Sequence, residues 1–276
     1  MNHPWYSEPR AAAPVTGRQG RLFAASMLAV VGLFVVGLLA LFLADVGYID
    51  APSFGSLLFS PRVRAAVWLS LWTSTATVAV GLLFAVPMGY ALSRYRFPGH
   101  ALVDSIVDLP IVLPPLVLGL SLLVFFYHSS VGSWIRATGL ELAFRHQGIV
   151  LCQFLVSASF GIRAVKLTFD GIDPRIEHVA MTLGCTRAGA FFRVALPMAR
   201  RGIIAGGILI WTRAFGLFAP LMVFVGTAER NRVLPTLIYL EQSTGQLQLA
   251  LAGAVLMLLL AAAALVVVRM VGLGQR

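Results

Sequence analysis

The chain has 276 residues, of which 59% are hydrophobic and only 12% are charged. Soluble domains contain about 45–50% apolar and about 25% charged residues, so this composition excludes an ordinary soluble domain and favours an integral membrane protein. The formal net charge of +10 would suggest nucleic acid in a soluble protein, but here the basic residues lie in short segments between apolar runs, so we expect no nucleic-acid partner.

Six apolar stretches are long enough to cross a lipid bilayer as helices. The first, residues 22–44, carries no charge. It would span about 35 Å as a helix, enough for a hydrocarbon core of about 30 Å. It is also longer than the apolar core of a signal peptide, so we expect it to be retained after a tail of residues 1–21. The other stretches are residues 66–93, 106–127, 148–169, 203–226 and 247–268. The sequence thus predicts an all-α integral membrane protein with about six transmembrane helices.

Prolines mark two of the predicted spans. Pro87 lies inside the second span and predicts a tilt or a kink. Pro110, Pro114 and Pro115 lie in the first turns of the third span, where they remove backbone donors and should distort the helix.

The distribution of lysine and arginine predicts the orientation. With a cytoplasmic N-terminus, the segments on the inside hold 14 basic residues and those on the outside hold 6. Basic residues concentrate on the cytoplasmic side of membrane proteins. We therefore expect both termini in the cytoplasm, together with the segment 170–201.

The segment 170–201 reads as a first helix that a glycine interrupts. Asp173 and Pro174 are suited to begin the helix, and Glu177 in its first turn is favourable to the helix dipole. Gly184 then predicts a left-handed position or a close backbone approach.

A second, shorter helix follows the glycine. Thr186 can cap a helix over about residues 187–192, which should end before Leu196 and Pro197. Such a short helix is marginal alone, so Phe191 and its neighbour Phe192 suggest a surface that something else completes. One interpretation is an amphipathic helix that lies on acidic headgroups, and the other is a docking element for a cytoplasmic protein.

This segment resembles the EAA loop of the permease subunits of ABC importers. The similarity lies in the spacing E-x-x-A-x-x-x-G, followed by a phenylalanine seven residues on and by Leu-Pro at twelve and thirteen. The residues that match are Glu177, Ala180, Gly184, Phe191, Leu196 and Pro197, with Thr186 between them. His178 stands where the family usually has the glutamate of the triplet, and Val179 stands where it has the first alanine. The resemblance implies a coupling helix that inserts into a groove of a separate ATPase subunit.

The resemblance covers residues 60–270 and favours one branch of the family. The stretches LPIVLPPLVLGLSLL and TRAFGLFAPLMVFVG are similar to segments of molybdate, tungstate and sulfate permeases, although Leu217 and Ala219 replace a glutamate and a glycine of that branch. The resemblance implies a type I importer permease in the bacterial inner membrane. It also implies a homodimer or a heterodimer with a second permease, two ATP-binding subunits and an extracytoplasmic solute-binding protein. Other solutes remain open at this point: a polyamine, a metal or a phosphonate.

The sequence offers no catalytic machinery. It has no G-x-x-x-x-G-K-[ST] phosphate loop and its five histidines form no ligand pair, so we expect no cofactor, no metal and no enzymatic activity in this chain. An ATP-independent secondary transporter is the rival class, but no internal repeat supports it.

A few polar residues near or within the spans are candidates for the translocation pathway or for packing. Arg213 lies about 15 Å into the fifth span by helical rise, where a charge marks a pathway, an ion pair or an interface. Pro114 and Pro115 are further candidates for the pathway. Asp104 and Asp108 are expected to pair with nearby basic residues, or else to favour a cationic substrate. The motif GIIAG, residues 202–206, allows close helix packing and is a candidate for the dimer seam.

Overall fold

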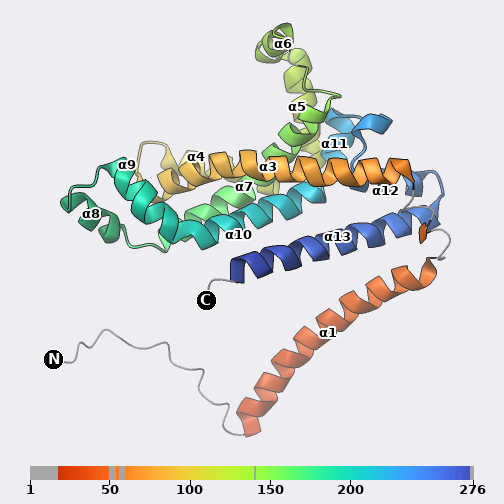
Figure 1. The fold of residues 1–276 in the computed structure, drawn as a ribbon, viewed down its shortest axis with the longest axis horizontal. Helices are drawn as coiled ribbons and strands as arrows, with labels where there is room; N and C mark the ends of the chain where they lie inside the picture. Colours follow the sequence, from red (N-terminus) through yellow and green to blue (C-terminus); the bar gives the residue numbers. More distant parts are fainter. Residues whose placement is uncertain (1–17, 50–53, 56–59, 140, 274–276) are drawn as a thin grey trace. The chain divides into compact units, whose positions relative to one another are not determined.

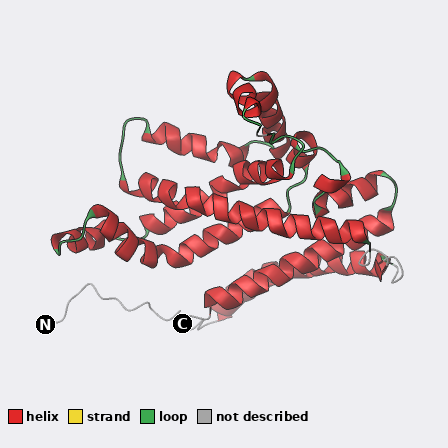
Figure 2. Cartoon of the chain, turned by 45° about the horizontal axis from the view of Figure 1, so that its top comes forward, coloured by secondary structure: helices red, strands yellow, loops and turns green. Residues whose placement is uncertain are grey.

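The computed structural model describes residues 18–49, 54–55, 60–139 and 141–273, and every regular element in those ranges is a helix (Figure 2). The chain divides into two compact units, residues 1–49 and 50–276. The first unit contains α1 (Arg18–Tyr48), whose most apolar window buries no side chain. Because its apolar residues surround the helix on all sides, α1 is suited to a lipid environment, as predicted for residues 22–44. Most of the predicted tail 1–21 lies outside the described residues.

Three long helices form the core of the second unit. They are α3 (Pro61–Arg94), α7 (His146–Asp170) and α10 (Leu196–Phe215), and they pack against one another along their lengths (Figure 1). Buried small and aromatic side chains meet where they cross, among them Ala85 on α3, Phe169 on α7 and Ala199 on α10. The small side chains let the helix axes approach closely.

The glycines of the GIIAG motif are used inside this chain. A Cβ at Gly202 would overlap the side chain of Thr168 on α7, and a Cβ at Gly206 would lie 3.2 Å from Cγ2 of Val165. The two glycines of the motif therefore pack α10 onto α7 of the same chain.

The third predicted span is broken rather than continuous. It consists of α4 (His100–Val112) and α5 (Pro115–His128), which are bent by 111° relative to each other. Pro114 cannot donate to α4, and Pro115 occupies the first turn of α5, where no backbone donor is needed. The expected distortion is confirmed, and it divides the predicted span 106–127 into two helices. The short α6 (Ser130–Ala137) follows α5.

The region of the fifth predicted span also differs from expectation. α9 (Arg187–Ala190), a π-helical turn (Phe191–Ala195) and α10 form one continuous helix over Arg187–Phe215. The expected end before Leu196 and Pro197 is wrong, because the wide π turn precedes the proline and Pro197 falls in the first turn of α10. The helix instead breaks at Gly216, and α11 (Ala219–Phe224) follows, so the predicted span 203–226 is divided.

The chain ends in a helical pair. After a 3₁₀ turn, η2 (Glu229–Asn231), α12 (Leu234–Ser243) packs against α13 (Leu247–Leu273). Within the described ranges, five helices are long and apolar enough to cross a membrane, and the bent pair α4–α5 brings the number to six. This agrees with the predicted number of spans.

Candidate functional site

The segment 170–201 lies at one end of the bundle and contains two short helices, α8 (Pro174–Thr182) and α9, that are separated by a turn (Figure 1). The side chain of Asp173 accepts a hydrogen bond from the backbone nitrogen of Arg175 at 2.9 Å and caps α8. Gly184 has a φ of +94°, a left-handed conformation that side chains disfavour. Oγ1 of Thr186 accepts from the backbone nitrogen of Gly189 at 3.1 Å and caps α9. The predicted helix starts and the glycine break are confirmed.

A buried ion pair attaches α8 to the core. Nε of Arg94, in the last turn of α3, donates to Oε1 of Glu177 at 2.8 Å, and the hydroxyl of Tyr90 donates to Oε2 at 2.6 Å. The two charged side chains are only 9% and 8% exposed. Both oxygens of Glu177 are thus bonded within the chain, and the carboxylate faces inward rather than toward the outer surface of the loop.

Arg94 also binds the end of α7. Its Nη1 donates to the carbonyl oxygen of Phe169 and its Nη2 donates to that of Ile172, both at 2.9 Å. The carbonyl oxygen of Phe169 also accepts from the backbone nitrogen of Ile172 at 3.0 Å, so the guanidinium adds a second donor there, and Ile172 itself lies just beyond the end of α7. One side chain therefore joins α3, the end of α7 and the start of α8.

The two phenylalanines of the loop have different environments. The ring centroid of Phe191 lies 4.6 Å from that of Tyr90 and 6.4 Å from that of Phe169, so Phe191 packs against the core. Phe192 is 63% exposed. The expectation that both rings belong to an open surface is correct only for Phe192.

The outer surface of the loop combines exposed apolar side chains with arginines. The apolar ones are Ile176, Val179, Leu183 and Phe192, and the arginines are Arg175, Arg187, Arg193, Arg200 and Arg201. Of the other predicted residues, His178, Thr186 and Pro197 are exposed, whereas Ala180 and Leu196 are half-buried. Beneath α8 a hollow of about 310 Å³ is lined by residues of α3, α8 and α9. Apolar groups rimmed by charge are typical of a protein-binding surface.

Arg213 occupies the last turn of α10, next to the break of the fifth span. Its guanidinium carbon lies 5.7 Å from the ring centroid of Phe160, and its Nε is buried without a hydrogen-bond partner among the described residues. Among the residues that the structure describes, no ion pair holds Arg213.

A buried hydrogen-bond network beside Arg213 was not predicted. Nε2 of Gln153 on α7 donates to the carbonyl oxygen of Ala214 at 3.1 Å, and its Oε1 accepts from Thr77 of α3 at 3.0 Å. The Ala214 carbonyl lies at the broken end of α10 and also accepts from the backbone nitrogen of Leu217 at 3.2 Å, so Gln153 adds a side-chain donor from α7 to this end. The signal in the sequence was a glutamine within an apolar span, opposite the Ser/Thr-rich residues 70–77.

The acidic pair on α4 binds basic residues of α7, as predicted. Nη1 of Arg163 lies 3.0 Å from Oδ1 of Asp104, Nζ of Lys166 lies 3.2 Å from the same oxygen, and Arg163 also pairs with Asp108. Both carboxylates are engaged inside the chain. Among the described residues, no group of three His, Cys, Asp or Glu side chains could hold a metal ion.

Comparison with known proteins agrees with this architecture. The family described as "Binding-protein-dependent transport system inner membrane component" matches residues 78–274. The chain is 36% identical to the molybdate/tungstate transport system permease protein WtpB of Thermococcus kodakarensis over 213 residues, which cover 77% of this chain and 81% of the relative. It is 37% identical to the molybdenum transport system permease protein ModB of Escherichia coli K12 over 180 residues, 63% of this chain and 77% of the relative.

Solved structures share the fold. A chain of a bacterial alginate ABC transporter, solved in complex with a periplasmic protein bound to an alginate pentasaccharide, superposes with a TM-score of 0.72 at 19% identity and covers 91% of this chain and 92% of its own. A chain of a methionine ABC transporter in inward-facing conformations superposes with a TM-score of 0.59 at 18% identity and covers 81% of this chain and 96% of its own. The helical architecture, the matched residues and the curated relatives together show that the chain belongs to the family of inner membrane components of binding-protein-dependent transport systems.

Proposed function

We propose that this permease imports a tetrahedral oxyanion of the molybdate and tungstate type. The observation that carries the proposal is the identity of 36% with a relative named for molybdate and tungstate transport, over 81% of that relative. Arg213 supports it, because its Nε is buried beside the broken fifth span without a hydrogen-bond partner among the described residues. Arginine stays charged in such surroundings, and its planar fork suits oxyanions.

The engaged acidic residues argue against a cationic substrate. Asp104 and Asp108 are the acidic pair that a polyamine would need, and both are bound to Arg163 on α7. A cation would have to displace this guanidinium. Because the chain belongs to a family whose transport depends on a binding protein, ATP is hydrolysed by a separate subunit and the chain itself is not an enzyme.

Transport by the reconstituted complex tests the substrate. Proteoliposomes that contain this permease, its ATPase and its solute-binding protein should accumulate labelled molybdate or tungstate only when ATP is enclosed with the ATPase. Unlabelled sulfate, phosphonate and spermidine serve as competitors. Inhibition by spermidine but not by tungstate would contradict the proposal.

We further propose that the segment 170–201 is the coupling loop that docks on the ATPase. Its exposed apolar and basic side chains form the surface, and the buried pair of Arg94 and Glu177 holds that surface to α3. The variant Gly184→Arg should leave the protein inserted but uncouple it, since φ is +94° there and a large side chain would project from the turn. Gly184→Ala is the control for backbone strain alone. ATP hydrolysis that still responds to substrate in Gly184→Arg would overturn the assignment.

The proposed assembly is a homodimer with two ATPase subunits in the bacterial inner membrane, with both termini in the cytoplasm. Co-purification of two differently tagged copies of this chain tests the homodimer, and a second permease in their place would indicate a heterodimer. In a chain that carries Cys185→Ala, the variant Arg230→Cys should react with an impermeant thiol reagent from outside. Arg193→Cys should react only after lysis, and the reverse pattern would overturn the orientation.

A further inference from the structure

A cavity lined by three arginines lies at the opposite end of α7 from the coupling loop. Its volume is about 350 Å³, and the arginines are Arg136 of α6, Arg145 of the loop before α7 and Arg230 of η2. α7 runs from His146 to Asp170, and a helix of that length separates its two ends by about 37 Å. The cavity and the coupling loop therefore lie on opposite faces of the bundle.

The charges around the cavity are unbalanced. Three guanidinium groups line it with a single carboxylate, that of Glu141, which leaves a formal charge of +2. Nη2 of Arg145 lies 2.9 Å from Oε2 of Glu141, but the two side chains are 54% and 62% exposed. An exposed pair of this kind is weak. Among the described residues, neither Arg136 nor Arg230 forms an ion pair.

Arg136 is held in place while some of its donors stay open. Its guanidinium carbon lies 4.7 Å from the ring centroid of Tyr127, and its Nη2 lies 3.4 Å from the carbonyl oxygen of the same residue. Its Nε is buried and has no hydrogen-bond partner among the described residues. A buried donor without a partner costs free energy, and an anion in the cavity would remove that cost.

The frame around the cavity is fixed by hydrogen bonds between two loops. Nε2 of His146 donates to the carbonyl oxygen of Arg230 at 2.7 Å, and Nδ2 of Asn231 donates to that of Phe144 at 2.9 Å. Phe144 has a φ of +59°, the only positive φ outside glycine in the described chain. Strained backbone of this kind persists where the surroundings determine it, often at ligand sites. The cavity is thus preformed.

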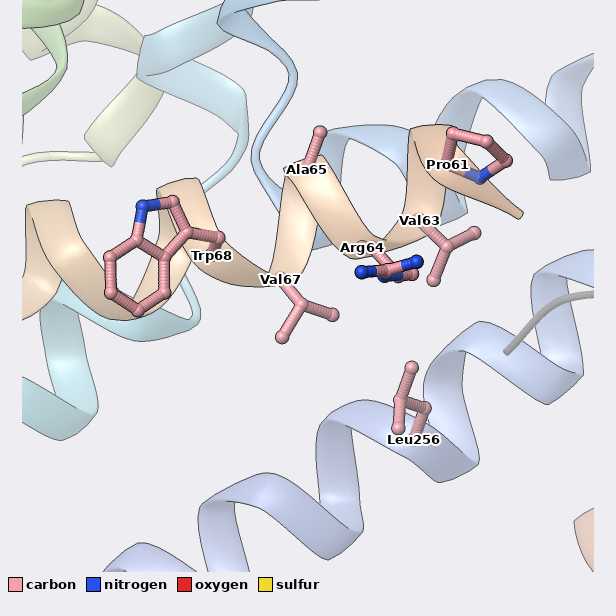
Figure 3. Close-up of a pocket in the computed structure, with 7 residues that line it drawn as sticks. All are labelled: Pro61, Val63, Arg64, Ala65, Val67, Trp68 and Leu256. Atoms are coloured by element: carbon pink, nitrogen blue, oxygen red, sulfur yellow. The ribbon is translucent and has the colours of Figure 1, made fainter. Parts of the chain in front are cut away.

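We propose that this cavity is an entry site that binds a divalent tetrahedral oxyanion of the molybdate type before it reaches Arg213. The inference rests on the proposed function for its substrate class and for the outward orientation of this face. The formal charge of +2 matches a divalent anion, and guanidinium forks bind such oxygens in pairs. A larger crevice between α3 and α13, of about 750 Å³, offers only Arg64 among apolar residues such as Trp68 and Leu256 (Figure 3). It lacks the charge that a divalent anion needs.

Equilibrium dialysis of labelled molybdate against the purified permease–ATPase complex, without the solute-binding protein, tests the site. We expect saturable binding that tungstate displaces and that monovalent nitrate displaces far less well. Arg136→Gln and Arg230→Gln should each weaken binding about tenfold or more, because each removes hydrogen bonds to a charged ligand. Arg64→Gln, on the same face but outside the cavity, should leave binding unchanged.

Glu141→Gln provides a test that misfolding cannot imitate. Removal of the only carboxylate of the cavity should tighten molybdate binding about two- to fivefold. No effect of Glu141→Gln together with no effect of Arg136→Gln would overturn the inference, as would the absence of binding in the wild-type complex. If those substitutions instead weaken only the attachment of the solute-binding protein, the cavity docks a protein and the inference is wrong.

Transport separates this inference from the proposed function. If the wild-type complex transports molybdate but the cavity does not bind it, only the entry site fails. If the complex transports no oxyanion at all, the proposed substrate is wrong. The entry site would then stand only if molybdate still binds in the cavity and the binding depends on Arg136 and Glu141 as described.

Discussion

Arg94 and Arg213 each lie in the last turn of a long core helix, but their surroundings differ in one respect. Arg94 donates through Nε, Nη1 and Nη2 to Glu177, Phe169 and Ile172. Arg213 has a buried Nε without a hydrogen-bond partner in the described chain, and its guanidinium carbon lies 5.7 Å from the ring centroid of Phe160. The donors of Arg94 thus find acceptors within one chain, whereas the Nε of Arg213 does not in the described residues.

The difference distinguishes a residue that connects helices from a residue that is free to bind a substrate or a partner chain. A buried charge whose donors are all bonded positions the elements that it connects, and its loss is costly. A buried donor left open is costly while the fold stands alone, so a substrate or a partner chain that bonds to it gains in affinity. We therefore expect substitutions at the Arg94 end to act first on stability and coupling, and substitutions at Arg213 to act on transport.

The largest effect is expected for Arg94→Gln. It leaves the Glu177 carboxylate buried without a counter-ion and removes a side-chain donor from the carbonyl oxygens of Phe169 and Ile172. Breaking a buried pair in this way costs about 3–5 kcal/mol. Unfolding of the purified permease in mixed micelles measures the loss, and proteoliposomes should show ATP hydrolysis that no longer drives transport.

Two further variants sharpen this prediction. Arg94→Lys keeps the charge but cannot reach three acceptors with a planar fork, so it should restore only part of the stability. Glu177→Gln keeps one acceptor oxygen, which can still accept from Arg94, while its NH2 group can donate to the hydroxyl of Tyr90, so it should cost less than Arg94→Gln. Equal losses in all three variants would mean that the charge pair does not hold α8 to the core.

An intermediate effect is expected for Gln153→Met, which has a similar volume but removes both side-chain hydrogen bonds. The hydroxyl of Thr77 would lose its partner, and the carbonyl oxygen of Ala214 would keep only its backbone donor. Buried groups left unpaired cost about 1–3 kcal/mol each. Mixed-micelle unfolding should show this loss, and the break of α10 beside Arg213 should become less well fixed, which would slow transport as well.

Ser157→Ala is a matched control on the same helix. Its hydroxyl bonds only to the carbonyl oxygen of Gln153 one turn earlier, so its removal should change stability by a few tenths of a kcal/mol. A loss in Ser157→Ala as large as that in Gln153→Met would show that packing, and not the bond to Ala214, supports the broken helix.

The local features of the coupling loop could be predicted because they depend on neighbouring residues. Asp173 and Thr186 cap their helices, and Gly184 has a positive φ, as their types and spacing indicated. The prolines of the third span likewise predicted a distortion, although they did not predict a bend of 111°. Caps, turns and proline effects act over a few residues, so the sequence carries them directly.

The contacts between distant residues could not be predicted in the same way. Arg94 and Glu177 are 83 residues apart, and Gln153 bonds to a carbonyl 61 residues away. The GIIAG motif shows the same limit, since close packing was expected but its partner is α7 of the same chain. The spacing of small and apolar residues in the sequence indicates which face of a helix packs. Which helix it packs against follows only from the tertiary structure.

A small effect on stability is expected for Arg213→Gln, because among the described residues no ion pair and no bond to its Nε would be lost. The ring centroid of Phe160 lies 5.7 Å from the guanidinium carbon, close to the limit of about 6 Å for a cation–π contact, so the free energy measured by mixed-micelle unfolding should change by no more than about 1 kcal/mol. Transport of molybdate should nevertheless fall markedly, because the fixed charge that offsets the desolvation of a divalent anion is gone. Arg213→Lys keeps the charge and should retain part of the activity. A loss of dimer assembly in Arg213→Gln would instead show that the open donor belongs to a contact between subunits. Normal assembly with normal transport would remove Arg213 from the pathway, and the contrast with Arg94 would then reflect solvation by lipid headgroups or water.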